Sequence, residues 1–202
     1  MMKRYCTAIL SLLLMASFRT EPKRIVMLGK EAPAFSLTAT DGRIVQLHDF
    51  DSAKGLIVVF TCNHCPFARL YTDRFNALAD RYTPLKVPLI AINPMDSLLY
   101  ETETLEGMRV FAASMQYHFS YLQDRTQQVA AAFHATHTPQ VFVLWRENSK
   151  WIIRYQGAID NNGQHPELAA PFVAQAVDAL LRGDTIAQPE RLSLGCEINY
   201  RK

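Results

Sequence analysis

The sequence predicts an α/β fold, with a central mixed β-sheet flanked by helices and an N-terminal β-hairpin as an extension. Two apolar runs, residues 56–60 and 87–92, have the length of buried strands, and apolar residues at helical spacing follow each of them. Two further apolar runs are separated by a short polar segment, so an antiparallel pair is expected to close the sheet. With 202 residues, the chain is long enough to bury a substantial core.

The first half of the domain begins with a short edge segment at residues 32–37. Asp41 and Gly42 form a hairpin turn that leads into a second strand at residues 44–47. The central strand, residues 56–60, is followed by a helix, and Pro66 suits the first turn of that helix because no N–H is needed there. The apolar positions at helical spacing are Leu70, Phe75, Leu78, Ala79 and Tyr82.

The second half begins with the strand at residues 87–92, which Asn93 and Pro94 end. Apolar spacing then predicts helices at residues 104–119 and 126–133. Strands at residues 141–145 and 151–155 flank a polar turn and form a hairpin. A last helix is expected at residues 166–182, and the tail after it shows no regular pattern.

The N-terminus has the pattern of a secretory signal peptide. Lys3 and Arg4 give a basic start, and the mostly apolar residues 5–18 are too few to span a bilayer but fit an h-region. The best candidate for the cleavage motif is Leu14-Met15-Ala16, and a buried N-terminal helix is the alternative. We therefore expect a signal peptide at residues 1–18, a lead-in at 19–30, a domain at 31–202, and a periplasmic or secreted protein.

Composition narrows the function classes. The net charge of +2 suggests no nucleic-acid partner, and no stable membrane span is expected once the signal is removed. Of the four cysteines, Cys6 would leave with the signal, so Cys62, Cys65 and Cys196 remain. An odd number in an oxidising compartment leaves one thiol over or pairing transiently.

The segment Cys62-Asn63-His64-Cys65 lies where a buried strand gives way to a helix. Two cysteines at this spacing can close a disulfide and reopen it, and a helix N-terminus favours a thiolate over a thiol. Zinc is the main alternative, but a closed zinc site needs four ligands, usually from two such pairs, and the chain has one. The context therefore favours redox chemistry.

Six local patterns together resemble a known superfamily. They are APAFSLTATDGRIVQLHDF, VVFTCNHCPFARLY, LIAINP, FHATHTPQVFVL, YQGAIDNN and GCEINYRK, distributed over residues 30–202. The chain resembles the thioredoxin-like superfamily, and within it the redoxin and peroxiredoxin-like branch related to the AhpC/TSA alkyl hydroperoxide reductases. The resemblance implies a thioredoxin-like fold and a cysteine-based oxidoreductase without a bound cofactor.

The resemblance also implies roles for matching residues. Cys62, normally the more exposed cysteine, would be the nucleophile that attacks a disulfide, and Cys65 the resolving thiol. Pro139 matches a loop proline that is cis in this superfamily and faces the CxxC, with Thr138 before it. Such a proline leaves the preceding backbone free to pair with an extended substrate.

Asn63 and His64 stand where ordinary thioredoxins carry Gly-Pro, and Thr61 replaces a tryptophan. A histidine beside the thiolate can stabilise it, lower its pKa and make the pair more oxidising. The alternative is that His64 faces solvent. We count Thr61, His64, Thr138 and Pro139 as active-site support.

The expected function is a thiol-disulfide oxidoreductase acting on protein or small-molecule thiols, reset by an upstream dithiol reductant or oxidant. A thiol-dependent peroxidase with antioxidant activity is the first alternative, but the P-x-x-x-T-x-x-C pattern would need threonine at Val59 or at Cys62. A copper metallochaperone is the second alternative, with His134 and His137 as further ligands. Copper-binding relatives, however, separate their cysteines by three residues.

Cys196 lies in the tail after Gly195, which lets the backbone turn sharply. It is either a buried residue that anchors the tail or a third redox thiol. We favour a redox or docking role near the active site, because a free thiol is a liability in an oxidising compartment.

Overall fold

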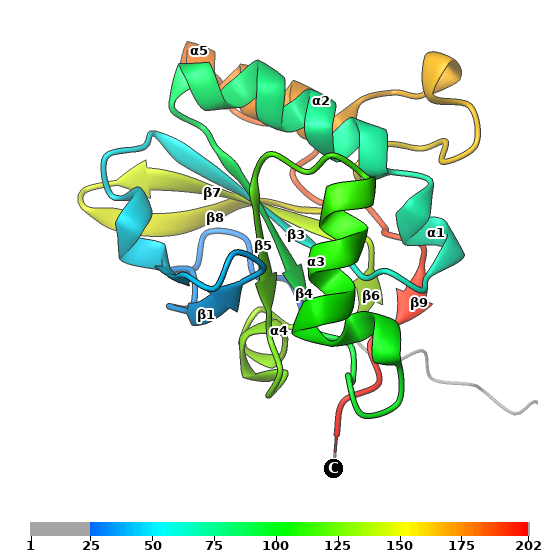
Figure 1. The fold of residues 1–202 in the computed structure, drawn as a ribbon. Coiled ribbons are helices and arrows are strands. Elements are labelled where there is room, and N and C mark those ends of the chain that lie inside the picture. Colours follow the sequence, from blue (N-terminus) through cyan, green and yellow to red (C-terminus); the bar gives the residue numbers. More distant parts are fainter. Residues whose placement is uncertain (1–24, 202) are drawn as a thin grey trace, which may run out of the picture.

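The structure is a computed structural model that describes residues 25–201 (Figure 1). The predicted signal peptide and the first half of the lead-in, residues 19–24, lie outside these residues. The elements, in chain order, are β1 (Ser36–Ala39), β2 (Ile44–Gln46), the 3-10 helix η1 (Leu47–Phe50), β3 (Gly55–Phe60), α1 (Pro66–Arg69), α2 (Thr72–Tyr82), η2 (Thr83–Leu85), β4 (Leu89–Asn93), η3 (Glu101–Glu103), α3 (Leu105–Ser114), β5 (Ser120–Gln123), α4 (Gln128–Ala132), β6 (His137–Thr138), β7 (Gln140–Glu147), β8 (Lys150–Gly157), η4 (Pro166–Leu168), α5 (Phe172–Arg182) and β9 (Cys196–Glu197).

Within the described residues, the main sheet has seven strands in the order β2-β1-β5-β4-β3-β7-β8. β4 is the central strand of this order, and its neighbour β3, predicted as the central strand, runs parallel to β4 and antiparallel to β7, so the sheet is mixed as predicted. β3 has a paired strand on each side, and residues pack against both of its faces. Every residue of β3 is therefore buried, which explains why its sequence is continuously apolar rather than alternating. The fold is thioredoxin-like.

Helices cover the sheet on both faces. Ile57 and Val59 of β3 pack into the cluster that contains α2 and α5, which lie together over the sheet (Figure 1). Leu56, Val58 and Phe60 point to the opposite cluster, because successive strand residues alternate in direction. That second cluster includes α4 and the segment that leads into β1. The two clusters clamp β3, so the loop that follows it starts from a rigid position.

Both predicted hairpins are present. β1 pairs antiparallel with β2 across the Asp41-Gly42 turn, where Gly42 has a φ of 85°. β7 pairs antiparallel with β8, and Asn148 and Ser149 form the turn with φ values of 47° and 65°. The peptide bond between Thr138 and Pro139 is cis, as the resemblance implied.

Three predicted boundaries are wrong. The helix expected at residues 104–119 ends at Ser114, the chain reverses at Gln116 with a φ of 54°, and β5 follows. Because β5 pairs with both β1 and β4, the segment predicted as an edge lies inside the sheet and β2 is the edge. The last predicted helix is a short 3-10 turn, η4, followed by α5, which begins after Pro171.

A fourth correction concerns the tail, which is not irregular. β9 pairs antiparallel with β6 in a separate two-stranded sheet next to α1 (Figure 1). Among the described residues, no helix combines the length and apolar character needed to cross a membrane.

Candidate active site

Three cysteines meet at the end of β3. The loop after Phe60 carries Cys62 and Cys65, and Cys65 directly precedes α1. Cys65 is bonded to Cys196 of β9, with their Cα atoms 6.0 Å apart. Cys62 is a free thiol with 2% of its surface exposed. The two cysteines of the CxxC are therefore in different states, and the third thiol considered from the sequence is bonded to one of them.

The burial of Cys62 differs from the implied role of a more exposed nucleophile. Its exposed surface is as small as that of neighbouring core residues, and it belongs to the same buried cluster as Cys65 and Phe60. Cys196 is only partly buried and packs against the core cluster. In this state, Cys196 is the most exposed of the three cysteines.

The cis-proline loop faces the cysteines, as the resemblance implied. The Oγ1 atom of Thr138 lies 3.1 Å from Sγ of Cys62 in a hydrogen bond in which either can donate. The carbonyl oxygen of the same residue lies 3.4 Å from Sγ of Cys65. Thr138 thus touches both sulfurs of the CxxC, and Pro139 holds it there. Thr61 is buried, and its N–H donates to the carbonyl of Ile92.

The tail occupies the strand edge beside the cis-proline. Cys196 lies opposite Thr138, and Glu197 lies opposite His137, in antiparallel register. A Cβ atom on Gly195 would lie 2.1 Å from the carbonyl oxygen of Thr138, so this close approach requires glycine. This is the edge at which the resemblance implied that a substrate would pair.

Contacts beyond the disulfide hold the tail in place. Ile198 is 3% exposed, and its N–H donates to the carbonyl of Thr136. The hydroxyl of Tyr200 donates to the carbonyl of Ala135 at 2.6 Å. Gln127 donates through Nε2 to the carbonyl of Asn199 at 2.9 Å. The tail is therefore docked by its own apolar and polar contacts.

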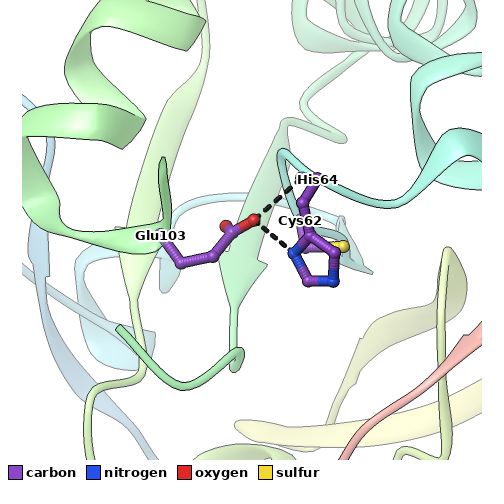
Figure 2. Close-up of side chains that lie close together, drawn as sticks. All are labelled: Cys62, His64 and Glu103. Atoms are coloured by element: carbon purple, nitrogen blue, oxygen red, sulfur yellow. Dashed lines mark hydrogen bonds and ion pairs between the residues drawn. The ribbon is translucent and has the colours of Figure 1, made fainter. Parts of the chain in front are cut away.

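A buried glutamate, missed from the sequence, lies against the CxxC loop. Glu103 has no exposed surface, and its carboxylate accepts the backbone N–H groups of Asn63 at 3.1 Å and His64 at 2.8 Å. Its Oε1 atom lies 2.7 Å from Nδ1 of His64 (Figure 2). Asn93 donates to its other oxygen at 2.5 Å. The local sequence Glu101-Thr102-Glu103-Thr104 resembles an exposed helix start, so nothing in it signalled a buried charge.

His64 is held between Glu103 and an aromatic ring rather than facing solvent freely. Its imidazole stacks on Tyr100, with ring centroids 4.1 Å apart and an interplanar angle of 12°. The side chain is 26% exposed. Asn63 is also fixed, because its Oδ1 accepts from the hydroxyl of Tyr121 at 2.9 Å. The dipeptide between the cysteines is therefore rigid.

Burial raises the pKa of Cys62 to about 12. The hydrogen bond from Thr138 and the backbone N–H of Cys65 oppose this shift, and the negative charge of Glu103 adds to it. The net pKa of Cys62 is thus raised in the state described here, whereas the sequence predicted a lowered pKa. The thiol is protonated at neutral pH, and its ionisation needs a proton acceptor or an opening of the site.

Cys62, His64 and Glu103 are also the group of described residues with ligand atoms close enough to hold a metal ion, within 4.8 Å of one another (Figure 2). The carboxylate of Glu103 is already satisfied by hydrogen bonds, and the thiol is protonated, so the set is poorly suited to a cation. His134 and His137, the histidines of the copper alternative, are not part of this group.

A cavity of about 440 Å³ opens on the other side of the cis-proline. It is lined by Pro139, by the α1 side chain of Phe67, which is 52% exposed, and by Leu192 and Leu194 of the tail segment. Asp160, Asn161, Asn162 and Gln164 also line the cavity, so its wall is both apolar and polar, and no cysteine is among its lining residues.

The comparison with known families agrees with this geometry. Residues 28–162, more than half of the chain, match the model of the AhpC/TSA family. The chain belongs to the AhpC/TSA family. Cys62, Cys65 and Thr138-Pro139 lie inside the matched region, whereas Cys196 lies beyond it.

Several solved structures are similar to this chain in fold. An uncharacterized conserved protein from Geobacillus kaustophilus is 34% identical, with a TM-score of 0.80, over 86% of this chain and 92% of its own. A hypothetical protein from Sinorhizobium meliloti is 30% identical, with a TM-score of 0.80, over 88% and 96%. A proposed thiol:disulfide interchange protein DsbE from Chlorobium tepidum shares the fold at 19% identity, with a TM-score of 0.60, over 76% and 97%. No protein of curated function matches the sequence significantly.

Proposed function

We propose that this AhpC/TSA protein is a thiol-disulfide oxidoreductase that moves a disulfide through three cysteines. The observation that carries the proposal is the convergence of Cys62, Cys65 and Cys196 at the cis-proline loop, with one disulfide closed and one thiol free. Thiol-disulfide exchange requires a thiolate to attack a disulfide sulfur through a mixed disulfide, and three cysteines at one site would allow successive exchanges.

The cycle starts from the fully reduced protein. The Cys62 thiolate attacks one sulfur of a substrate disulfide, a Cys62–substrate disulfide forms, and the other substrate sulfur leaves as a thiolate that takes up a proton. Cys65 then loses its proton and attacks the Cys62 sulfur, which releases the second substrate thiol. Two electrons have passed from the protein to the substrate, and the protein holds a Cys62–Cys65 disulfide.

The third exchange moves the disulfide to the tail. Cys196 attacks the Cys65 sulfur, Cys62 leaves as a thiol, and the Cys65–Cys196 bond forms. Because Cys196 is partly exposed while Cys62 and Cys65 are buried, an upstream dithiol can reach the disulfide from the tail side. Reduction at Cys196 returns all three thiols, and the same steps in reverse would oxidise a dithiol substrate.

Substrates of this cycle are protein or small-molecule disulfides. The pairing of β9 with β6 supports a substrate that binds as an extended segment. The tail itself pairs with the edge of β6 in this way, and its Cys196 lies opposite Thr138. A periplasmic or secreted location is part of the proposal and depends on the signal-like sequence of residues 1–18.

The test compares wild type with Cys62→Ser and Cys65→Ser on oxidised glutathione and on a disulfide-bonded protein. Cys62→Ser should abolish exchange, and Cys65→Ser should accumulate a mixed disulfide on Cys62 that mass spectrometry identifies. Survival of exchange in Cys62→Ser would refute the assignment of the nucleophile. Hydrogen peroxide turnover is measured in parallel, and rapid peroxide reduction without disulfide exchange would favour the peroxidase alternative instead.

A further inference from the structure

Glu103 presents a physical problem that the exchange cycle alone does not explain. A fully buried carboxylate is costly, and this one lies close enough to Cys62 to disfavour the thiolate that the cycle requires. Part of this cost is offset because both oxygens accept hydrogen bonds, from the N–H groups of Asn63 and His64 and from the side chain of Asn93. A charge at this place is useful when a positive charge forms beside it.

We propose that His64 accepts the proton of Cys62 during attack and that Glu103 is the positioning residue that makes it a proton acceptor. The proposal rests on the proposed function, because it supplies the proton transfer that the first exchange needs. Figure 2 shows the Glu103 carboxylate facing the Nδ1 edge of the His64 ring, with the Cys62 sulfur beside that ring. A ring nitrogen, the sulfur and a carboxylate oxygen lie within 4.8 Å of one another.

The hydrogen bond selects the tautomer of His64. A neutral imidazole carries one N–H and one lone pair, and the carboxylate 2.7 Å from Nδ1 accepts the N–H at that nitrogen. The lone pair is therefore on Nε2, the nitrogen that Glu103 does not engage. Stacking on Tyr100 fixes the plane of the ring, so a proton can be taken up without a search over ring orientations.

The transfer balances as follows. The S–H proton of Cys62 moves to Nε2 of His64, and the new thiolate attacks a sulfur of the partner disulfide. The partner S–S bond breaks as the new S–S bond forms, and the leaving thiolate takes the proton back from the imidazolium. Glu103 stabilises the imidazolium while it exists, in the manner of a carboxylate behind a catalytic histidine. No proton is gained or lost over the exchange.

The charged and ionisable groups named below, on the surrounding elements, are less suited than His64 to accept the proton of Cys62. Tyr121 of β5 faces Asn63 and Asn93, and burial raises its pKa well above the usual value, as it does for the neighbouring Tyr117. On α1, the guanidinium of Arg69 lies over the ring of Phe111. On the β6 and β9 side, Nδ1 of His137 hydrogen-bonds to Thr136, and Glu197 is exposed. Cys65 and Cys196 do not titrate while bonded to each other.

The test measures the alkylation rate of Cys62 against pH in a Cys65→Ser background, where Cys62 is the one cysteine left in the CxxC. Peptide mass spectrometry follows that residue in the full chain. We compare Glu103→Gln, Glu103→Asp, His64→Ala and the double variant Glu103→Gln/His64→Ala. At pH 7, we expect His64→Ala and Glu103→Gln each to slow alkylation by at least about 100-fold, the lower end of the range for a lost general base.

Two results distinguish proton transfer from a merely structural role. The double variant should be no slower than His64→Ala alone, since Glu103 acts through His64, and added free imidazole should partly restore His64→Ala. The profiles of the variants should approach that of the parent protein at high pH, where the thiol ionises without help. Glu103→Asp keeps the charge and should retain more of the rate than Glu103→Gln.

Superimposable pH profiles for the parent protein and His64→Ala would overturn the proposal. It would also be overturned if Glu103→Gln slowed alkylation by the same factor in the His64→Ala background as in the parent protein. His64 is partly exposed, so its alanine variant keeps the proposal testable even where Glu103→Gln fails to fold. Alkylation needs no substrate disulfide. A protein that lacks exchange activity but keeps this pH dependence would therefore contradict the proposed function, while the role of His64 and Glu103 in proton transfer would be retained.

Discussion

The pairing of Cys65 with Cys196 predicts how much stability the protein loses on reduction. The bond joins residues separated by 131 positions, and the chain-entropy relation for a loop of this length gives a stabilisation of about 5 kcal/mol. A Cys62–Cys65 disulfide spans only three positions, and the same relation gives about 1.6 kcal/mol. The loss in unfolding free energy on reduction should therefore differ by about 3 kcal/mol between the two pairings.

The assay is urea unfolding at pH 7, with and without a phosphine reductant, for three proteins. Wild type and Cys62→Ser should both lose about 2–5 kcal/mol on reduction, since both keep the long-range bond and native disulfides commonly contribute this much. Cys196→Ser should lose much less, because the remaining pair closes a short loop. Cys62→Ser is the matched control, as it removes a thiol from the same site without touching the bond.

The reasoning would be refuted by the opposite pattern. If reduction destabilised Cys196→Ser as much as wild type, the tail disulfide would not be the stabilising bond. If Cys62→Ser became insensitive to reductant, the oxidised pair would be Cys62–Cys65, and the Cys65–Cys196 pairing would be wrong.

Two other predictions concern the proline loop. Gly195→Ala places a Cβ atom 2.1 Å from the carbonyl oxygen of Thr138, so β9 should separate from β6 and the Cys65–Cys196 bond should form several-fold more slowly. Differential alkylation after reoxidation measures that rate, and wild-type kinetics would show that the strand pairing does not guide the bond. Thr138→Val removes the hydroxyl that lowers the pKa of Cys62, so that pKa should rise and alkylation at pH 8 should slow. Thr138→Ser should restore the parent rate, and an unchanged rate in Thr138→Val would contradict the hydrogen bond.

Much of the site was predictable because its residues act locally. The CxxC at the strand–helix junction and the Thr138-Pro139 pair are short patterns whose geometry depends on a few neighbouring residues. Long apolar runs likewise predicted β3, β4 and the β7–β8 hairpin. These predictions succeeded because each element is defined by residues that are close together in the sequence.

The errors involve contacts between distant parts of the chain. β5 has four residues and is preceded by a connecting segment with the apolar residues Tyr117 and Phe119, so its pairing with β1 and β4 is what defines it as a strand. Glu103 is 40 positions from Asn63, and its burial depends on η3 folding over the CxxC loop. The raised pKa of Cys62 has a similar origin, because the burial that causes it depends on a core cluster built from distant parts of the chain.

The most direct test of the three-cysteine cycle is disulfide mapping over time after one equivalent of substrate disulfide is added to the reduced protein. Samples are quenched with acid, free thiols are alkylated, and peptides are mapped without reduction. The account predicts a Cys62–substrate disulfide first, a transient Cys62–Cys65 disulfide next, and a final Cys65–Cys196 disulfide with Cys62 free. A final Cys62–Cys65 disulfide, with Cys196 alkylated as a free thiol at every time point, would contradict it.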